Sequence, residues 1–201
     1  MEFSKETLDE TLSVLKKGGV ILYPTDTVWG LGCDATDPEA VAKIYRIKNR
    51  SDSKSLVLLA SDMDMIARFV REVPEMAVQL VEVNDRPMTI IYPGAMTAAA
   101  GEPADRHLLA HNVVAEDGSV GIRIPMMDFC VELVRRLGRP VVSTSANISG
   151  EPTPKNFSEV SDPIRKAVDY TVDPALESGA TGQSSSIIKL GVDSTIQIIR
   201  K

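Results

Sequence analysis

Aromatic residues and cysteines are scarce in this 201-residue sequence. Aromatic side chains make up 4% of it, so the core has to be mostly aliphatic within a hydrophobic share of 43%. The two cysteines, Cys33 and Cys130, lie far apart and form no CxxC pattern. This spacing argues against a disulfide framework or a cysteine-based zinc site and favours a reducing, cytoplasmic location.

Long apolar runs and several familiar motifs are also missing. No stretch approaches 18 consecutive apolar residues, and the first twenty residues carry four carboxylates, so we expect neither a membrane span nor a signal peptide. The net charge of −6 argues against a protein that mainly coats nucleic acid. Neither the phosphate-binding pattern GxxxxGK[ST] nor the hydrolase pattern GxSxG occurs.

Helical and strand-like hydrophobic patterns alternate along the whole chain. Helices are predicted from a cap at Ser4 to Gly18, from Asp37 to Lys48, after a cap at Ser61, from Pro74 onward, from a cap at Asp128 to Gly138, and over residues 157–167. Strands are predicted at residues 20–23, 28–33, 56–60, 88–92, 120–124, 140–142, 170–172, 186–190 and 195–199. Residues 93–119 read as a long loop. The order of the elements predicts one α/β domain with a mixed sheet.

The stretch at residues 140–150 reads PVVSTSANISG and joins a strand to a polar segment. A short β-branched strand runs into serines, a threonine and an asparagine, and none of these side chains is charged. Ligands bind at the carboxyl ends of strands in open α/β sheets, so these groups are candidates for a binding site. A polar turn with a capping serine remains the alternative.

Another segment carries three cationic side chains within seven residues. Residues 48–56 read KNRSDSKSL, which places Lys48, Arg50 and Lys54 between a predicted helix end and a predicted buried strand. A triphosphate needs several cationic donors that converge from one loop, and this spacing can supply them. Cations near a helix C-terminus are also stabilising by themselves, so a solvated helix end remains the alternative.

Two other patterns carry less weight. Residues 30–35 fit GxGxxA, but the following helix begins only at Asp37, which disfavours a dinucleotide site. Asp105, His107 and His111 lie close together in the predicted loop without a full ligand set, so we expect no metal site made by protein side chains.

Four motifs resemble those of one family. They are YPTDTVWGLGCDA at residues 23–35, the KxRxxxK segment, GIRIP at 121–125 and STSANISG at 143–150. In this order they are similar to the YrdC-type domain of the threonylcarbamoyl-AMP synthases, and the similarity covers essentially the whole chain. Asn49 and Ser51 stand where the family often has glycine and proline. The resemblance implies a single YrdC-like domain over residues 1–201, with a twisted mixed parallel and antiparallel sheet, flanking helices and an open ligand cleft.

The resemblance also implies an activity. Family members combine L-threonine, bicarbonate or carbon dioxide, and ATP with Mg²⁺, and they release pyrophosphate and threonylcarbamoyl-AMP. The adenylate then feeds threonylcarbamoyladenosine formation on tRNA through a separate transferase complex, and tRNA itself is a further candidate partner. Such a nucleotidyl transfer needs positioning and charge neutralisation more than a strong base. No general base is evident in the sequence.

Site residues follow from the matching motifs. The resemblance implies that Lys48 and Arg50 are catalytic, that Lys48, Arg50, Lys54, Ser119, Ser145, Asn147, Thr153 and Arg200 bind ATP, and that Thr27, Arg123, Ser143 and Ser185 bind threonine. A guanidinium group suits the threonine carboxylate because it can bind both oxygens. Leu59 stands where some members have a histidine.

Two other functions remain as alternatives. The same type of domain could bind structured RNA without catalysis through the 48–54 segment, although the negative net charge disfavours this. It could also act in carbamoyl transfer, as related domains do within longer hydrogenase-maturation proteins.

Overall fold

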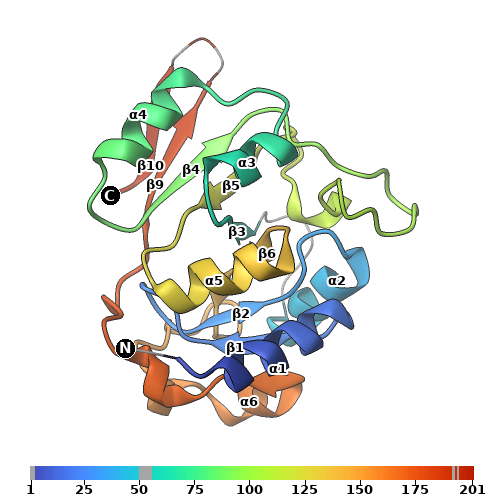
Figure 1. Ribbon diagram of the computed structural model, residues 1–201, viewed down its shortest axis with the longest axis vertical. Helices are drawn as coiled ribbons and strands as arrows, with labels where there is room; N and C mark the ends of the chain where they lie inside the picture. The colour runs from blue at the N-terminus through green and yellow to red at the C-terminus, as the bar shows by residue number, and fades with distance from the viewer. Residues whose placement is uncertain (1–2, 50–55, 192, 194) are drawn as a thin grey trace.

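The computed structural model describes residues 3–49, 56–191, 193 and 195–201, and its strands form two mixed sheets (Figure 1). One sheet has the order β7-β2-β1-β8 and the other the order β10-β9-β4-β5-β3-β6. The strands are β1 (Ile21–Tyr23), β2 (Gly30–Gly32), β3 (Val57–Leu59), β4 (Met88–Tyr92), β5 (Val120–Arg123), β6 (Val141–Val142), β7 (Thr144–Ser145), β8 (Tyr170–Thr171), β9 (Ser186–Leu190) and β10 (Ile196–Arg200). Mixed pairing was predicted, but the division into two sheets was not.

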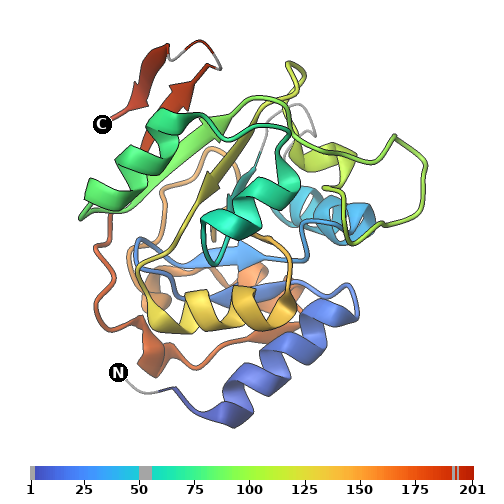
Figure 2. The ribbon, with the colours of Figure 1, turned by 45° about the horizontal axis from the view of Figure 1, so that its top comes forward.

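Helices lie against both sheets. The α-helices are α1 (Lys5–Lys16), α2 (Pro38–Ile47), α3 (Met63–Phe69), α4 (Glu75–Val83), α5 (Asp128–Leu137) and α6 (Asp162–Ala167), and the 3-10 turns are η1 (His111–Val113), η2 (Phe157–Glu159) and η3 (Pro174–Glu177). Helices α3 and α4 lie on one face of the six-stranded sheet, whereas α1 packs beside α5 (Figures 1 and 2). Buried side chains from both sheets and from the helices join in one hydrophobic cluster.

The helix ends test the predicted caps. Ser4 and Asp37 cap α1 and α2 as predicted, since each side chain accepts a hydrogen bond from a first-turn amide. The predicted cap at Ser61 is wrong: Asp62 caps α3, and the Ser61 hydroxyl donates to the Asp62 carboxylate. The cap predicted at Asp128 is also wrong, because Met127 precedes α5 and Asp128 is its first helical residue.

The helix predicted over residues 157–167 is divided into two pieces. Residues 157–159 form the turn η2, and α6 begins only at Asp162. Pro163 lies in the first turn of α6, where its missing amide proton is tolerated. Within one continuous helix Pro163 could not donate to the carbonyl oxygen of Glu159, so the helix interior is excluded there.

Residues 140–145 connect the two sheets. Strand β6 pairs with β3 in the six-stranded sheet, and β7 pairs with β2 in the four-stranded sheet. Between them, the Ser143 amide donates to the Val57 carbonyl at 2.8 Å. The close approach needs Gly32, because a Cβ atom there would lie 2.7 Å from a ring carbon of Tyr23 and 3.0 Å from the Val142 carbonyl. The serines that follow β6 are thereby placed at the boundary between the sheets.

No helix within the described ranges is long and apolar enough to cross a membrane.

Candidate active site

A cavity of about 280 Å³ opens where the two sheets meet. Its walls come from the turn after β1, the starts of β2 and β3, the end of β5, the strand β7 and the segments that begin β9 and end β10. The lining residues are Thr25, Thr27, Val28, Gly30, Leu56, Val57, Arg123, Ser143, Thr144, Ser145, Ser184, Ser185, Ile187 and Arg200. The cavity is therefore rich in hydroxyl groups and carries two guanidinium groups.

The four residues predicted to bind threonine come together in this cavity. Thr27, Arg123, Ser143 and Ser185 all line it, although they come from four separate segments of the chain. Arg123 ends β5, and Thr27 lies in the turn between β1 and β2. The structure brings these residues together, and their role in binding threonine stays a prediction.

Arg123 is a buried cation that is held by a carboxylate. Its Nη1 donates to both oxygens of Asp26, at 2.7 Å and 2.9 Å, and its Nη2 donates to the Thr27 hydroxyl at 3.2 Å. The two charged side chains are only 3% and 7% exposed. A buried charge pair of this kind requires hydrogen bonds to its remaining polar atoms, and the amide of Met126 supplies one to Asp26 at 3.1 Å. Arg123 is thus fixed before any ligand enters.

The turn that carries Asp26 is itself hydrogen-bonded internally. The hydroxyls of Thr25 and Thr27 lie 2.8 Å apart, and Thr25 donates to the Val28 carbonyl. Beneath the turn, the Cys130 thiol donates to the Pro24 carbonyl at 3.4 Å. Burial raises the pKa of Cys130 far above its ordinary value, so this thiol stays protonated and serves as a donor. The turn is a rigid wall of the cavity.

The segment before β9 closes another side of the cavity. The amides of Thr181 and Gly182 donate to the carbonyls of Asp26 and Thr27, which ties this segment to the turn after β1. Ser185 then contacts the Thr89 hydroxyl at 2.8 Å, and its carbonyl accepts from Nε of Arg200 at 2.9 Å. Arg200, predicted to bind ATP, therefore lies on the cavity next to a residue predicted to bind threonine.

Lys48 approaches the 143–150 segment from the end of α2. Its Nζ donates to the carbonyls of Ser145 and Asn147, at 2.5 Å and 2.7 Å, and to the Asn147 side-chain oxygen at 3.2 Å. The Ser145 hydroxyl donates to the same Asn147 oxygen at 2.5 Å. Lys48 is 2% exposed. Three residues predicted to bind ATP are thus in mutual contact, and one of them, Ser145, lines the cavity.

The other predicted ATP residues are placed differently. Ser119 and Thr153 do not line the cavity, and the Ser119 hydroxyl donates to Asp117 at 2.6 Å. Arg50 and Lys54 lie outside the described residues.

No metal cluster was found among the residues that the structure describes. No group of three or more histidine, cysteine, aspartate or glutamate side chains could hold an ion in this part of the chain. The Asp105 carboxylate instead accepts a hydrogen bond from the backbone amide of His107. The hydroxyl-rich cavity has no carboxylate among its lining residues.

Asp26 pairs with Arg123 at the candidate site, and it was not predicted as a site residue from the sequence. It lies inside the PTDT motif, but its partner Arg123 is 97 residues away in the chain. The only signal was a carboxylate in a turn of otherwise uncharged residues. Thr25, Thr144 and Ser184 also line the cavity and were not predicted as site residues.

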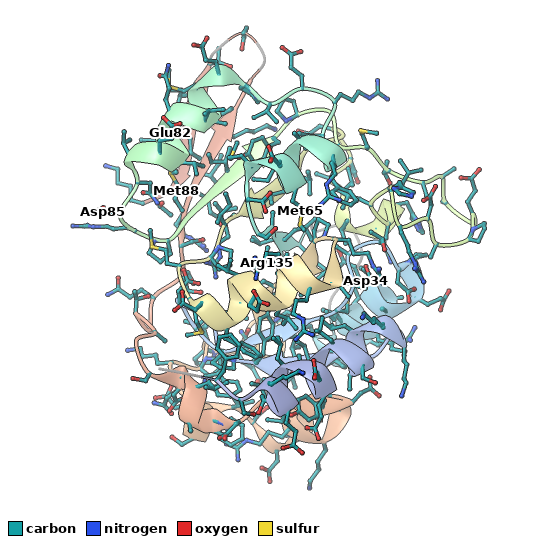
Figure 3. All side chains as sticks on the ribbon, in the orientation of Figure 1. Asp34, Met65, Glu82, Asp85, Met88 and Arg135 are labelled. Atoms are coloured by element: carbon teal, nitrogen blue, oxygen red, sulfur yellow. The ribbon has the colours of Figure 1, made fainter. Side chains whose placement is uncertain are left out.

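A second cavity, of about 360 Å³, lies on the other side of Asp26. Asp26 lines this cavity together with residues 126–129 at the start of α5, with Asp85 and Arg86, and with parts of the 176–181 segment. Asp85 lies in the surface turn between α4 and β4, and its side chain is 92% exposed (Figure 3). The Asp26–Arg123 pair thus spans from one cavity to the other.

Comparison with known proteins places this architecture in a family. Residues 13–201 match the Sua5, YciO and YrdC family, whose description reads "Telomere recombination". A threonylcarbamoyl-AMP synthase from Stenotrophomonas maltophilia is 34% identical over 183 residues, which cover 90% of this chain and 92% of the relative. The chain belongs to the Sua5, YciO and YrdC family.

Solved structures show the same fold. A doubly substituted variant of P. abyssi Sua5 superposes with a TM-score of 0.81 at 24% identity over 99% of this chain. P. abyssi Sua5 complexed with L-threonine superposes with a TM-score of 0.76 at 23% identity over 94% of this chain. The chain spans 57% and 52% of these two proteins, a little over half of their length. At this identity the likeness establishes the fold and not the ligand.

Proposed function

We propose that this chain forms threonylcarbamoyl-AMP and pyrophosphate from L-threonine, bicarbonate or carbon dioxide, and ATP. The observation that carries the proposal is the cavity in which Arg123, Thr27, Ser143 and Ser185 converge, in a chain whose curated relatives are named threonylcarbamoyl-AMP synthases. The product would serve threonylcarbamoyladenosine formation on tRNA through a separate transferase complex.

The proposed chemistry needs little from the protein beyond placement. The amine of threonine loses a proton and bonds to the carbon of carbon dioxide, which gives a carbamate. A carbamate oxygen then attacks the α-phosphorus of ATP in line, and the bond to the β-phosphate oxygen breaks as pyrophosphate leaves. Hydroxyl groups and cations that hold both reactants in one cavity supply this placement.

Arg123 is the proposed anchor for the threonine carboxylate. Its Nη1 and one Nη2 hydrogen are engaged by Asp26 and Thr27, and no described residue accepts a hydrogen bond from Nε. The edge formed by Nε and Nη2 therefore retains two donors for a carboxylate. The P. abyssi protein has been solved with L-threonine, which supports the same ligand here.

The nucleotide is proposed to lie in the same cavity beside the threonine. Ser145 and Arg200 line this cavity, and Asn147 and Lys48 contact Ser145 from behind. We propose that the phosphates meet these groups together with Arg50 and Lys54, with Mg²⁺ bound through the phosphates. Ser119 and Thr153 are proposed to contact the nucleotide from beyond the cavity.

Omission of single reactants tests the proposal. Pyrophosphate release is measured with ATP, Mg²⁺, bicarbonate and L-threonine, and then with each left out in turn. The expected result is release that requires both threonine and bicarbonate. ATP binding without threonine-dependent release would contradict the proposal and would turn attention to RNA binding or to turnover of carbamoyl phosphate.

A further inference from the structure

Asp26 and Thr27 together contact two of the three nitrogens of the Arg123 guanidinium group. Both carboxylate oxygens of Asp26 accept hydrogen bonds from one nitrogen, Nη1, so Asp26 holds this nitrogen on one side of the guanidinium group. Thr27 takes one hydrogen of Nη2. Without these partners the guanidinium group could present either of its two-donor edges to the cavity.

The Asp26 carboxylate is held from two sides. The amide of Met126, just before α5, donates to one carboxylate oxygen of Asp26 at 3.1 Å, and the backbone carbonyl of Asp26 accepts from the Thr181 amide at 3.0 Å. The turn after β1, the start of α5 and the segment before β9 therefore meet at Asp26. Since Asp26 is 6% exposed, these bonds are shielded from water.

Asp26 does not line the cavity in which Arg123 lies. It lines the second cavity on the far side of the ion pair. A ligand in the first cavity thus meets Arg123 and not Asp26. An influence of Asp26 on ligand binding would have to pass through Arg123.

The geometry points to Asp26 as a positioning residue that orients Arg123, so that the edge formed by Nε and Nη2 faces the carboxylate of the amino-acid substrate. This inference rests on the proposed function for the identity of the substrate. Removal of the Asp26 charge would strengthen the bare attraction of Arg123 for an anion. We expect the loss of orientation to outweigh this gain, because binding of both carboxylate oxygens depends on direction as well as on charge.

A double-mutant cycle tests the inference. Asp26→Asn keeps the shape of the side chain and removes its charge, and it is combined with Arg123→Ala. In the wild-type background we expect Asp26→Asn to raise the KM for threonine by roughly 10- to 100-fold with a smaller change in kcat, the range for a small misplacement of a binding group. In the Arg123→Ala background the same substitution is expected to change the threonine KM by less than about twofold.

Two further variants serve as a replacement and as a control in the double-mutant cycle. Asp26→Glu retains the charge but moves the carboxylate, and it takes the place of Asp26→Asn if the latter does not fold. Asp85→Asn is the matched control, because it removes an exposed carboxylate that lines the same second cavity and does not touch Arg123. An equal rise in the threonine KM in both backgrounds, or no rise in either, would overturn the inference.

One readout is independent of the proposed reaction. In protein with ¹⁵N-labelled arginine, nuclear magnetic resonance detects whether the Arg123 guanidinium group rotates. In the wild type we expect separate Nη1 and Nη2 signals, since Asp26 and Thr27 each hold one nitrogen. In Asp26→Asn these signals are expected to merge. Unchanged separate signals in Asp26→Asn would overturn the positioning role even if the chain showed no threonine-dependent turnover.

Discussion

A carboxylate paired with a cation lies at each end of β5, but one pair is exposed and the other is buried. Just before the strand begins, the Ser119 hydroxyl donates to Asp117, which also accepts from Lys189 at 2.5 Å. At the last residue of the strand, Arg123 donates to Asp26. The Asp117–Lys189 pair is about half exposed, at 51% and 38%, whereas the Asp26–Arg123 pair is buried.

The difference in burial decides what each pair contributes. Exposed ion pairs are screened by water and add little stability. A buried pair is rigid, and loss of either partner leaves an uncompensated charge inside the protein. Only the buried end lies on the cavity, so we infer that the strand ends in a fixed binding group and begins in an adjustable surface contact.

The largest effect is expected for Arg123→Ala. The substitution leaves the Asp26 carboxylate buried without its cation, and we expect the free energy of unfolding to fall by about 3–5 kcal/mol. The threonine KM is expected to rise roughly 10- to 150-fold, the equivalent of charge-assisted hydrogen bonds of about 1.5–3 kcal/mol. Urea unfolding and threonine-dependent pyrophosphate release measure the two effects.

Arg86→Ala provides the control for Arg123→Ala. Arg86 is 87% exposed and lines the second cavity but not the first, so its removal is expected to leave both quantities nearly unchanged. A wild-type threonine KM in Arg123→Ala would show that Arg123 does not bind threonine.

A smaller effect is expected at the exposed end, and it depends on pH. The hydrogen bonds from Lys189 and Ser119 lower the pKa of Asp117 from its ordinary value of 3.8 to about 2. The folded state therefore binds this proton less readily than the unfolded chain does. The contribution of the ionised Asp117 carboxylate to folding stability is complete above pH 4 and is lost as the pH falls towards 2.

Lys189→Met tests this pH dependence by urea unfolding between pH 5 and pH 2. The stability difference between wild type and variant is expected to be modest at pH 5 and to shrink towards pH 2. Lys166→Met, which removes a cation in the last turn of α6, is the control. A difference that stays constant or grows as the pH falls would show that the Asp117–Lys189 contact does not act as described.

The smallest effect is expected for Ser119→Ala. This substitution removes one hydrogen bond to a half-exposed carboxylate, and we expect a loss of about 1 kcal/mol or less. If Ser119 contacts the nucleotide, the ATP KM is expected to rise by about fivefold or less, and the threonine KM is expected to stay the same. A rise in the threonine KM as large as that of Arg123→Ala would contradict the contrast between the two ends of β5.

Local features of this fold could be predicted well from the sequence. The caps at Ser4 and Asp37 depend only on residues within the next turn, and the short apolar runs of β3 and β4 are bounded by polar residues. The cap at Asp62 was missed because two neighbouring residues can both cap a helix. The break before α6 was missed because the apolar pattern continues across Pro163.

Features that join distant segments could not be predicted locally. The division into two sheets depends on β6 and β7, which are consecutive in the chain but pair with strands of different sheets. The site residues were predicted because their motifs resemble a family, and the structure brings the four predicted threonine residues into one cavity. The Asp26–Arg123 ion pair was missed because a contact across 97 residues leaves no periodic signal in the sequence.

A crystal structure of this chain with L-threonine would test the central claim most directly. We predict that the amino-acid carboxylate lies in the first cavity, hydrogen-bonded to Nε and Nη2 of Arg123, while Nη1 stays bound to Asp26. Threonine bound elsewhere, or an Arg123 side chain that has left Asp26 to reach the ligand, would contradict the account.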